Sequence, residues 1–518
     1  MGSFTSDVKG NAESIYPESR VLIIITGGTI CMRPSDAGLV PVDKFLEKAM
    51  ARRPSFNDES DGVPLKAVKN GVEVTIESLR TPLSSYSRHI RYGAIEFTPL
   101  LDSSSISSLG WTQIANTVKD NYHLFDGFVV LHGTDSLSYS ASALSFMMQD
   151  LGKPVILTGS QASIFALQSD AVDNLLGSLI IAGTFVIPEV CLFFHHTLFR
   201  GNRTTKVSAS SFEAFASPNC EPLAKVTSLG VDVNWTLVRR PTKIAQFQVT
   251  KSLDTAHVAC VRIFPGIKPE MVDSVLRVPG LKGLILETFG MGNAPAGVDG
   301  SLTKVIASAV QRGVIIVNVS QCTNGFVSPL YAPGYALGRA GVVFGHDLTS
   351  EAALTKLSYL LALPDLAEKT GEIAARMSRS LRGELTELAT PSFSHPTTGD
   401  LASGQLTPAE SSFTTLGWAI ASGDLQAVLD LLESDTETPD LLQRSDYMGN
   451  TAVHLAAVGP EVKVLKELLE RGASVHARNR ANNTALFLAH KRGNTECVSL
   501  LQKAGARYWE GERPEKAT

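Results

Sequence analysis

Short apolar runs alternate with stretches of helical periodicity through most of the chain. The runs predict strands at residues 21–25, 127–131, 154–158, 190–194, 258–263, 283–286 and 314–319. A continuous apolar run indicates a strand that is buried on both faces, and alternation with helices indicates parallel pairing. The pattern therefore predicts an α/β fold with largely parallel sheets.

An irregular segment divides these strands into a longer first group and a shorter second one. Proline interrupts regular structure there, because it lacks an N–H donor and has a fixed φ; the prolines are at 218, 222 and 241. We predict a first α/β lobe at residues 20–218, an inter-lobe connection at 219–254 and a second lobe at 255–387. Residues 1–19 are polar, and we expect them to be a disordered N-terminal segment.

The last part of the chain repeats itself with the period of an ankyrin unit. Thr451 and Thr484 are 33 residues apart, and the segment TAVHLA that begins at Thr451 is close to the ankyrin signature. The next copy has Phe487 in the place of His454. We predict a small all-α domain of ankyrin repeats at residues 413–509, followed by a disordered tail at 510–518. Residues 388–412 are rich in Ser, Thr, Pro and Gly, which predicts a linker.

The charge and composition of the sequence argue against several classes of function. The net charge is −5, so no basic surface is expected to bind nucleic acid. The six cysteines form no C-x-x-C pair, as in a cytoplasmic protein with reduced thiols and no zinc site. The longest apolar stretch, residues 179–194, contains Pro188 and Glu189, so we expect no membrane span. The sequence has no phosphate-binding G-x-x-x-x-G-K-[ST] loop, and we expect neither a metal nor an organic cofactor.

Two strands end in similar polar segments that could carry chemistry. TGGT at 26–29 follows the first strand, and HGTD at 132–135 follows the second. Ligands of open α/β sheets bind beyond the carboxyl ends of the strands. If these two strands are neighbours, Thr29 and Thr134 face one another with Asp135 beside them, which suits an amine-bearing substrate.

A threonine hydroxyl needs a base before it becomes a good nucleophile. Lys206, in the polar turn after the strand at 190–194, is the candidate proton acceptor. His132 is expected to pack at its strand end, and His195 and His196 lack the H-E-x-x-H spacing of zinc sites. Ser160 is not in a G-x-S-x-G turn, so a serine hydrolase is a poor interpretation.

Several ordered segments resemble the type I, cytoplasmic-type L-asparaginases in the form that carries C-terminal ankyrin repeats. They are TGGTI at 26–30, HGTDSLSYSASALSF at 132–146, LTGSQ at 157–161, LFRGNRTTKVSA at 198–209 and DLTSEAALTKLSYLL at 347–361. The resemblance implies a two-lobed asparaginase-like fold and the hydrolysis of L-asparagine to L-aspartate and ammonia.

The same resemblance implies roles for individual residues. Thr29 is the expected nucleophile, which forms an acyl-enzyme, and Thr134, Asp135 and Lys206 form a second catalytic triad. Asp102, Ser103 and Ser104 are expected to bind the substrate, together with Thr134 and Asp135.

The loop after Thr29 contains no tyrosine, although many relatives carry a catalytic one there. Tyr331 is the expected substitute, with Tyr335 as the alternative. Asn293 resembles a substrate-binding residue that comes from a neighbouring subunit, and the family's assembly implies a homodimer or homotetramer.

Other functions stay open at this stage. The catalytic lobes could have become a weakly active scaffold or amino-acid sensor that acts through a protein partner of the ankyrin repeats. Glutamine could compete with asparagine, because one methylene changes binding by only about 1–3 kcal/mol. Ester or lysophospholipid hydrolysis is not excluded by the sequence.

Overall fold

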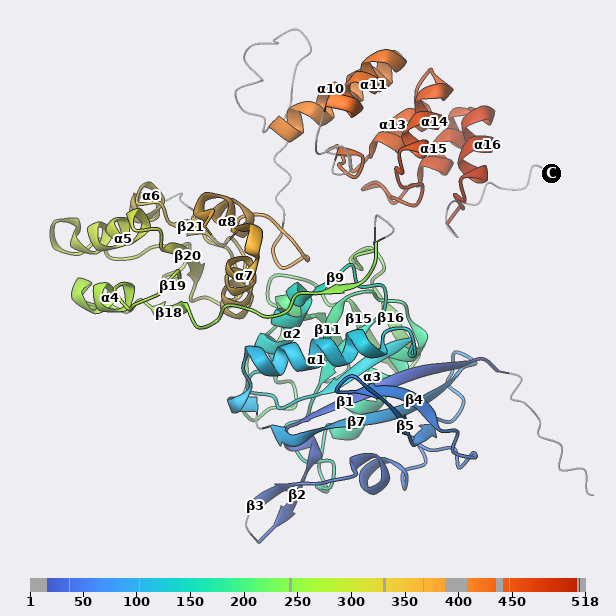
Figure 1. Cartoon of the computed structure of the whole chain (residues 1–518), viewed down its shortest axis with the longest axis vertical. Coiled ribbons are helices and arrows are strands. Elements are labelled where there is room, and N and C mark those ends of the chain that lie inside the picture. The colour runs from blue at the N-terminus through green and yellow to red at the C-terminus, as the bar shows by residue number, and fades with distance from the viewer. Residues whose placement is uncertain are drawn as a thin grey trace, which may run out of the picture. The chain divides into compact units, whose positions relative to one another are not determined.

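The computed structural model describes most of the chain, and contacts divide it into two units. The described residues are 16–36, 38–101, 103–241, 245–328, 332–366, 368–386, 408–434, 441–446, 448–509 and 512. The first unit contains residues 1–240 and 246–387, and the second contains residues 241–245 and 388–518. Figure 1 shows the two α/β lobes of the first unit and the helices of the second.

A nine-stranded sheet forms the first lobe, with the strand order β16-β15-β12-β11-β10-β8-β1-β7-β6. Its central strands are parallel: β7 (His89–Leu101), β1 (Glu18–Gly27), β8 (Gly127–Leu131), β10 (Val155–Thr158) and β11 (Val190–Phe194). Antiparallel strands complete the edges: β6 (Ser78–Arg80), β12 (Thr197–Arg200), β15 (Ala224–Thr227) and β16 (Gly230–Val233). β1 pairs directly with β8, as the interpretation of their polar ends requires.

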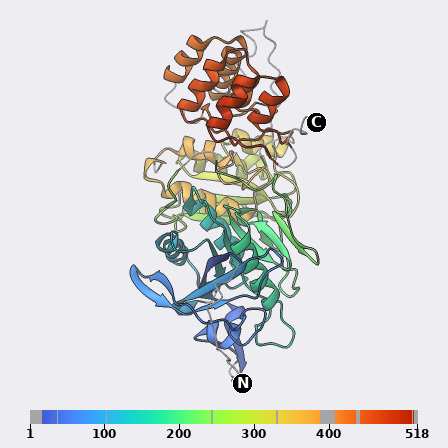
Figure 2. The ribbon, with the colours of Figure 1, turned by 90° about the vertical axis from the view of Figure 1, so that its right-hand side faces the viewer.

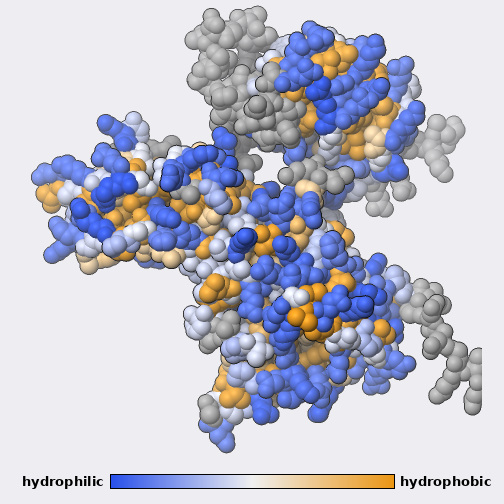
Figure 3. Space-filling model, viewed as in Figure 1, coloured by the Kyte–Doolittle hydropathy of each residue, from blue (hydrophilic) through white to orange (hydrophobic). Residues whose placement is uncertain are grey.

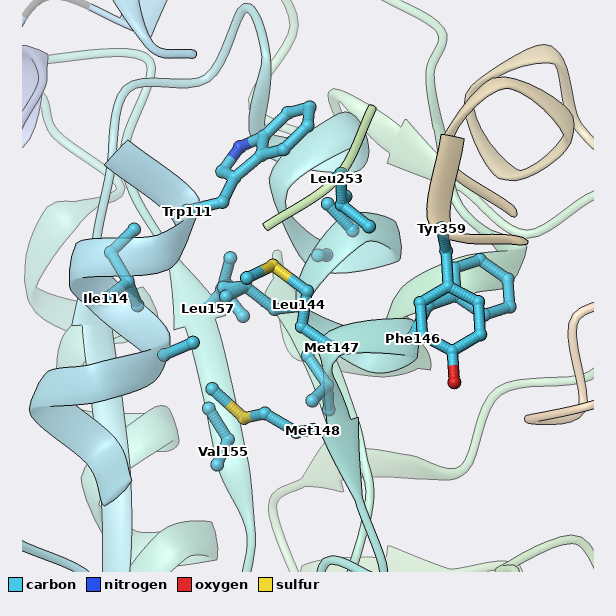
Figure 4. Close-up of a cluster of buried hydrophobic side chains, with 14 of the residues drawn as sticks. Trp111, Ile114, Leu144, Phe146, Met147, Met148, Val155, Leu157, Leu253 and Tyr359 are labelled. Atoms are coloured by element: carbon cyan, nitrogen blue, oxygen red, sulfur yellow. The ribbon is translucent and has the colours of Figure 1, made fainter. Parts of the chain in front are cut away.

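The apolar run of β1 is buried on both faces of the sheet, as predicted. Leu22 and Ile24 belong to the hydrophobic cluster on one face, whereas Val21, Ile23 and Ile25 belong to the cluster on the other. The first cluster packs under α1 (Ser108–Asn121) and α2 (Leu137–Met147), as Figure 4 shows, and the second under α3 (Ala171–Thr184). All five side chains are fully buried, so the strand ends leave a rigid base for the polar segments that follow.

The first lobe also contains short two-stranded ribbons and helical turns outside this sheet. The two-stranded ribbons are β2 (Met32–Ser35) with β3 (Gly38–Pro41), β4 (Leu65–Lys69) with β5 (Val72–Ile76), β9 (Met148–Gln149) with β17 (Gln248–Val249), and β13 (Thr205–Lys206) with β14 (Phe215–Ala216). Short helical turns are η1 (Thr29–Cys31), η2 (Leu46–Met50), η3 (Ser103–Ser105) and η4 (Gly201–Arg203).

The second lobe has a parallel four-stranded sheet of β18 (Val258–Arg262), β19 (Gly283–Thr288), β20 (Ile315–Ser320) and β21 (Val343–Phe344). Its helices are α4 (Pro269–Leu276), η5 (Val298–Gly300), α5 (Ser301–Gln311), α6 (Ala332–Arg339), α7 (Ser350–Ala362), η6 (Pro364–Leu366) and α8 (Thr370–Met377). α7 packs on α2 of the first lobe, where the rings of Phe146 and Tyr359 stack with centroids 5.9 Å apart (Figure 4). The two lobes therefore share one core.

The second unit is a stack of helices with a hydrophobic core of its own. The helices are α10 (Pro408–Ser422), α11 (Leu425–Ser434), α13 (Ala452–Val458), α14 (Val462–Glu470), α15 (Ala485–Arg492) and α16 (Thr495–Lys503), and Figure 2 shows them side by side. Thr451 and Thr484, which define the sequence period, occupy equivalent N-caps of α13 and α15. The all-α repeat domain is therefore present as predicted.

Several observed boundaries differ from the predicted ones. β15 and β16 lie inside the segment that we expected to be an inter-lobe connection, because the prolines flank this hairpin instead of interrupting it. α10 begins at Pro408, so the end of the expected linker is helical. β1 begins at Glu18, within the expected N-terminal segment, and Glu512 of the expected tail is buried. Residues 1–15, 388–407 and 513–518 lie outside the described residues.

The surface of the described residues is of mixed polarity. On the face in Figure 3, hydrophilic residues cover most of both units, with smaller hydrophobic areas between them. None of the helices in the described part of the chain is long and apolar enough to cross a membrane.

Candidate active site

Glycine backbones bring the carboxyl ends of neighbouring strands into close contact. Gly28, after β1, has φ +90°, and a Cβ there would lie 2.4 Å from the backbone nitrogen of Gly133, after β8. A Cβ on Gly133 would lie 2.6 Å from the side chain of Ser103, after β7. A Cβ on Gly159, after β10, would lie 2.3 Å from the His132 carbonyl oxygen. Side chains at these positions would push the strand ends apart, so the glycines are needed for the compact site.

Thr29 is the first residue of η1, directly after Gly28, and its side chain is partly exposed. Ile30 and Cys31, which follow it, are buried and anchor the turn. Thr26 has a different role, because its buried hydroxyl donates a 2.9 Å hydrogen bond to the Leu131 carbonyl oxygen. Of the two threonines of the first motif, Thr26 is buried and Thr29 is partly exposed.

Thr134, Asp135 and Lys206 form a contiguous polar group. The Lys206 ammonium Nζ lies 2.9 Å from Thr134 Oγ1 and 2.8 Å from Asp135 Oδ1. The Thr134 side chain is buried, whereas the side chain of Asp135 is 72% exposed and that of Lys206 is 19% exposed. The hydroxyl is thus shielded from water while the carboxylate stays open to a charged ligand.

The loop that leads to Lys206 is fixed by the second lobe. Arg203 is buried, and its guanidinium donates hydrogen bonds of 2.9 Å to the Asp347 carboxylate and 2.8 Å to the Glu384 carbonyl oxygen. The Thr205 hydroxyl donates a 2.8 Å hydrogen bond to Glu351 of α7, and burial raises the pKa of that carboxyl group. Lys206 is therefore positioned by residues from both lobes.

Gln161 is a member of the polar group that the sequence analysis missed. The Thr134 hydroxyl donates a hydrogen bond of 3.2 Å to the Gln161 side-chain oxygen Oε1. Gln161 follows β10, the strand next to β8, so strand-end position was a usable signal. The neighbouring Ser160 of the same LTGSQ motif is occupied elsewhere, because its hydroxyl donates to the Ala162 carbonyl oxygen.

None of the described contacts brings His132, His195 or His196 into this group. His132 is fully buried; its Nδ1 contacts the Gly133 carbonyl oxygen at 2.7 Å and its Nε2 contacts Ser140 Oγ at 2.9 Å. Burial lowers the pKa of His132 to about 4, so the ring stays neutral at neutral pH. His195 and His196 form the turn between β11 and β12. The described residues contain no group of three or more His, Cys, Asp and Glu that could hold a metal ion.

The structure describes two of the three serine and aspartate residues that were predicted to bind the substrate after β7. Ser103 is buried against Gly133, and its carbonyl oxygen accepts a 2.6 Å hydrogen bond from the Ser136 hydroxyl. Ser104 is exposed in the same turn, η3. Both follow β7, which flanks β1 on the side opposite β8.

The remaining predicted site residues are not brought into this group by any described contact. Asp102 and Tyr331 lie outside the described residues, and Tyr335, the alternative tyrosine, is 60% exposed on α6. Asn293 lies in the turn after β19 in the second lobe, and its side-chain oxygen is buried with no hydrogen-bond partner among the described residues.

Comparisons with known families agree with this architecture. The family described as "Asparaginase, N-terminal" matches residues 20–239, and "Glutaminase/Asparaginase C-terminal domain" matches residues 257–374. "Ankyrin repeats (3 copies)" matches residues 414–510. The chain belongs to the L-asparaginase family. The first match includes β15 and β16, in line with their place in the first sheet.

Individual asparaginase-family relatives cover most of the chain. The mouse (Mus musculus) protein named 60 kDa lysophospholipase is 40% identical over 480 residues, covering 89% of this chain and 80% of that protein. The L-asparaginase of Dirofilaria immitis is 36% identical over 501 residues, covering 94% of this chain and 82% of that protein. The crystal structure of L-asparaginase I from Vibrio cholerae matches with a TM-score of 0.59 and 37% identity, covering 71% of this chain and 100% of that one.

Proposed function

We propose that the protein is a cytoplasmic L-asparagine amidohydrolase, which converts L-asparagine and water to L-aspartate and ammonia. The observation that carries this proposal is the contact of Lys206 with both Thr134 and Asp135, at the end of the strand beside the one that presents Thr29. This arrangement combines a shielded hydroxyl, a proton acceptor and an open carboxylate within one asparaginase-family fold.

In the proposed first half-reaction, Thr29 Oγ1 attacks the side-chain amide carbon of the substrate. The hydroxyl proton passes to a nearby acceptor, for which Tyr331 is the candidate, and the carbon–nitrogen bond then breaks. The departing nitrogen takes a proton and leaves as ammonia, so that an ester between Thr29 and the aspartyl group remains. Backbone N–H groups of Thr29 and Thr134 are the candidate donors to the oxyanion.

In the proposed second half-reaction, water attacks this ester. Thr134 takes a proton from the water and passes its own hydroxyl proton to Lys206, which must be unprotonated at that moment. The ester carbon–oxygen bond breaks, Thr29 regains its proton, and L-aspartate leaves. No metal or organic cofactor is part of this scheme.

The substrate's charged groups have separate candidate partners. The exposed Asp135 carboxylate can pair with the α-ammonium group, while Ser103, Ser104 and Asp102 are the candidates for the α-carboxylate. Asn293, with its unpartnered buried oxygen, is proposed to complete the site of a neighbouring subunit in a homodimer or homotetramer. The ankyrin repeats are proposed to bind a protein partner.

The test is the release of ammonia from L-asparagine by the full chain and its Thr29→Ala variant. Thr117→Ala, on α1 and away from the strand ends, is the matched control. We expect turnover in the wild type and the control and at least a thousandfold loss in Thr29→Ala. Full activity in Thr29→Ala would refute the assignment of the nucleophile.

L-glutamine and a lysophospholipid should be assayed in parallel, because the mouse relative carries the name lysophospholipase. Release of fatty acid without release of ammonia would replace the amide substrate by an ester. No turnover of any of the three substrates would favour a scaffold or sensor that acts through the ankyrin repeats.

A further inference from the structure

Thr134 Oγ1 has two side-chain partners, Lys206 and Gln161, and each of them could accept its one hydrogen if Lys206 were uncharged. Lys206 Nζ lies 2.9 Å from the oxygen, and Gln161 Oε1 lies 3.2 Å from it. A hydroxyl group has one hydrogen to donate and two lone pairs with which to accept. An ammonium group can only donate, so while Lys206 is charged the Thr134 hydrogen is free to point to Gln161.

The orientation of the Gln161 amide is fixed by its own contacts. Its Nε2 lies 3.2 Å from the carbonyl oxygen of Ser211 and 3.4 Å from that of Ser208. Carbonyl oxygens only accept hydrogen bonds, so the NH₂ group must face them and Oε1 must face Thr134. Gln161 therefore offers Thr134 an acceptor and never a donor.

The backbone of Gln161 is held just as firmly. Its N–H group donates to both carboxylate oxygens of Asp170 at 3.1 Å, and Asp170 is buried. Asn174 Nδ2 contacts the same carboxylate at 3.1 Å and also donates to the Gly159 carbonyl oxygen at 3.0 Å. The segment between β10 and α3 is thus built around the buried Asp170 carboxyl group, which holds Gln161 beside Thr134.

We propose that Gln161 is a positioning residue, which draws the Thr134 hydroxyl hydrogen away from Lys206 and thereby sets the pH at which the proton relay operates. The inference rests on the proposed role of Thr134 and Lys206 in hydrolysis. Thr134 can accept a proton from water only if it gives its own to Lys206, and Gln161 Oε1 competes for that hydrogen. The competition favours the state in which Lys206 is the donor.

Several carboxylates set the charge around this relay. Asp135 contacts Lys206 directly, Asp170 holds the Gln161 backbone, and Glu351 of α7 accepts a hydrogen bond from Thr205, the neighbour of Lys206. Substitutions at Gln161 leave all of these in place. Both variants described next also lose the amide contacts with Ser208 and Ser211, so it is the opposite sign of their two shifts that reports on the Thr134 hydroxyl and its acceptor.

Two nearly isosteric substitutions make opposite predictions for the acidic limb of the pH profile of kcat. Gln161→Met removes the acceptor, frees the Thr134 hydrogen for Lys206, and should move the limb to lower pH by about half a unit. Gln161→Glu adds a negative charge that stabilises the charged lysine, and should move the limb to higher pH by about one unit. Gln149→Met is the control, because Gln149 makes hydrogen bonds to Thr250 and Tyr359 away from the site.

A second readout does not need turnover. Trace acetylation of Lys206 by acetic anhydride, quantified by mass spectrometry across a range of pH, gives the midpoint at which this lysine becomes nucleophilic. We expect the midpoint to shift in the same directions as the limb: down in Gln161→Met, up in Gln161→Glu, and not in the control.

The two readouts separate the two proposals. A wild-type enzyme that releases ammonia, with neither readout shifted in the Gln161 variants, overturns the role of Gln161 and leaves the proposed function intact. A wild-type protein without turnover whose labelling midpoint still shifts overturns the proposed function, and with it the relay, but retains the effect of Gln161 on the Thr134 hydroxyl and Lys206. Equal shifts in both variants would indicate a merely structural effect and would also overturn the proposal.

Discussion

The guanidinium of Arg203 donates a 2.9 Å hydrogen bond to the carboxylate of Asp347, and so joins the loop before Lys206 to the second lobe. Both side chains are buried, and Asp347 also accepts hydrogen bonds from the backbone N–H and the hydroxyl of Thr386. Thr386 lies at the end of the described part of the first unit. The position of Lys206 therefore depends on contacts that form only when both lobes are folded.

Asp347→Asn should destabilise the protein most at neutral pH and least in acid. Burial alone would raise the pKa of Asp347, but hydrogen bonds from Arg203 and Thr386 lower it below its ordinary value. A lowered carboxyl pKa stabilises the folded state above the unfolded value of about 4, and this contribution is lost as the pH falls below it. Urea unfolding at several pH values should show the difference between wild type and variant shrinking from pH 7 to pH 3.

The control for this prediction is Asp273→Asn on α4, whose carboxylate pairs with the mostly exposed Arg277 just after that helix. An exposed pair of this kind is screened by water and contributes little to stability, so its loss should leave the curves almost unchanged. A difference between wild type and Asp347→Asn that is constant with pH would show that the ionised carboxylate is not what stabilises the contact.

Gly28→Ala should abolish activity and lower stability because of a collision and not only because of backbone strain. The new Cβ would lie 2.4 Å from the Gly133 nitrogen, and Gly28 has φ +90°. Forcing backbone apart in a packed core costs about 1–3 kcal/mol or more, in addition to the strain of a positive φ. Thermal unfolding and ammonia release measure the two effects.

Gly266→Ala separates strain from collision. Gly266 has φ +88°, but a Cβ there would meet nothing within 4 Å. This variant should show only the cost of the backbone conformation, about 1 kcal/mol, with normal turnover. Equal losses in both variants would mean that the contact between the ends of β1 and β8 is not critical.

The sequence predicted the parts of this structure that depend on local pattern. Three features could be predicted without knowledge of distant contacts. They are the apolar run at residues 21–25, the glycines of TGGT and HGTD, and the repeat period of Thr451 and Thr484. β7, in contrast, was missed, because Arg91 and Glu96 interrupt its apolar pattern.

Distant partners explain how β7 tolerates these charges. Arg91 is buried beside Glu18 of β1 at 2.9 Å, and the Glu96 carboxylate accepts a 2.6 Å hydrogen bond from the Phe45 backbone. Gln161 was missed for a related reason, since its role depends on carbonyl groups of a loop that folds back from Lys206. Spacing along the chain does not encode such contacts.

Lys356→Met should be strongly destabilising, because it leaves a buried carboxylate unpaired. Lys356 and Glu384 have no exposed side-chain surface, and Nζ lies 2.6 Å from Oε1. Burial alone would raise the pKa of Glu384, but Lys356 and the backbone N–H groups of Leu381 and Arg382 lower it below its ordinary value. Loss of one partner of such a pair costs about 3–5 kcal/mol.

The same variant should also lose activity, because the segment around Glu384 holds Arg203. Lys369→Met is the control, since its contact with Glu372 is exposed and at 3.8 Å. Denaturant unfolding and turnover of the full chain test both effects. An unchanged unfolding midpoint in Lys356→Met would show that the buried pair does not stabilise the fold.

Glu512→Ala should loosen the last ankyrin repeat without affecting hydrolysis. In the middle repeat His454 Nδ1 contacts the Thr451 hydroxyl at 2.9 Å, but the last repeat has Phe487 at the equivalent position. Glu512 takes over there, because its buried carboxylate accepts hydrogen bonds of 2.5 Å from the Thr484 N–H and 2.8 Å from its hydroxyl. Loss of these bonds to a charged acceptor should cost about 2 kcal/mol.

Hydrogen exchange of α15 and α16 should detect this loss, with Glu496→Ala as the control, since Glu496 is exposed on α16. The double variant Phe487→His with Glu512→Ala should recover part of the protection, because histidine restores the partner that Thr451 has in the preceding repeat. Unchanged exchange in Glu512→Ala would show that the carboxylate does not close the repeat stack. Recovery in the double variant would show that either a carboxylate or a histidine can supply the hydrogen-bond partner of the buried N-cap threonine.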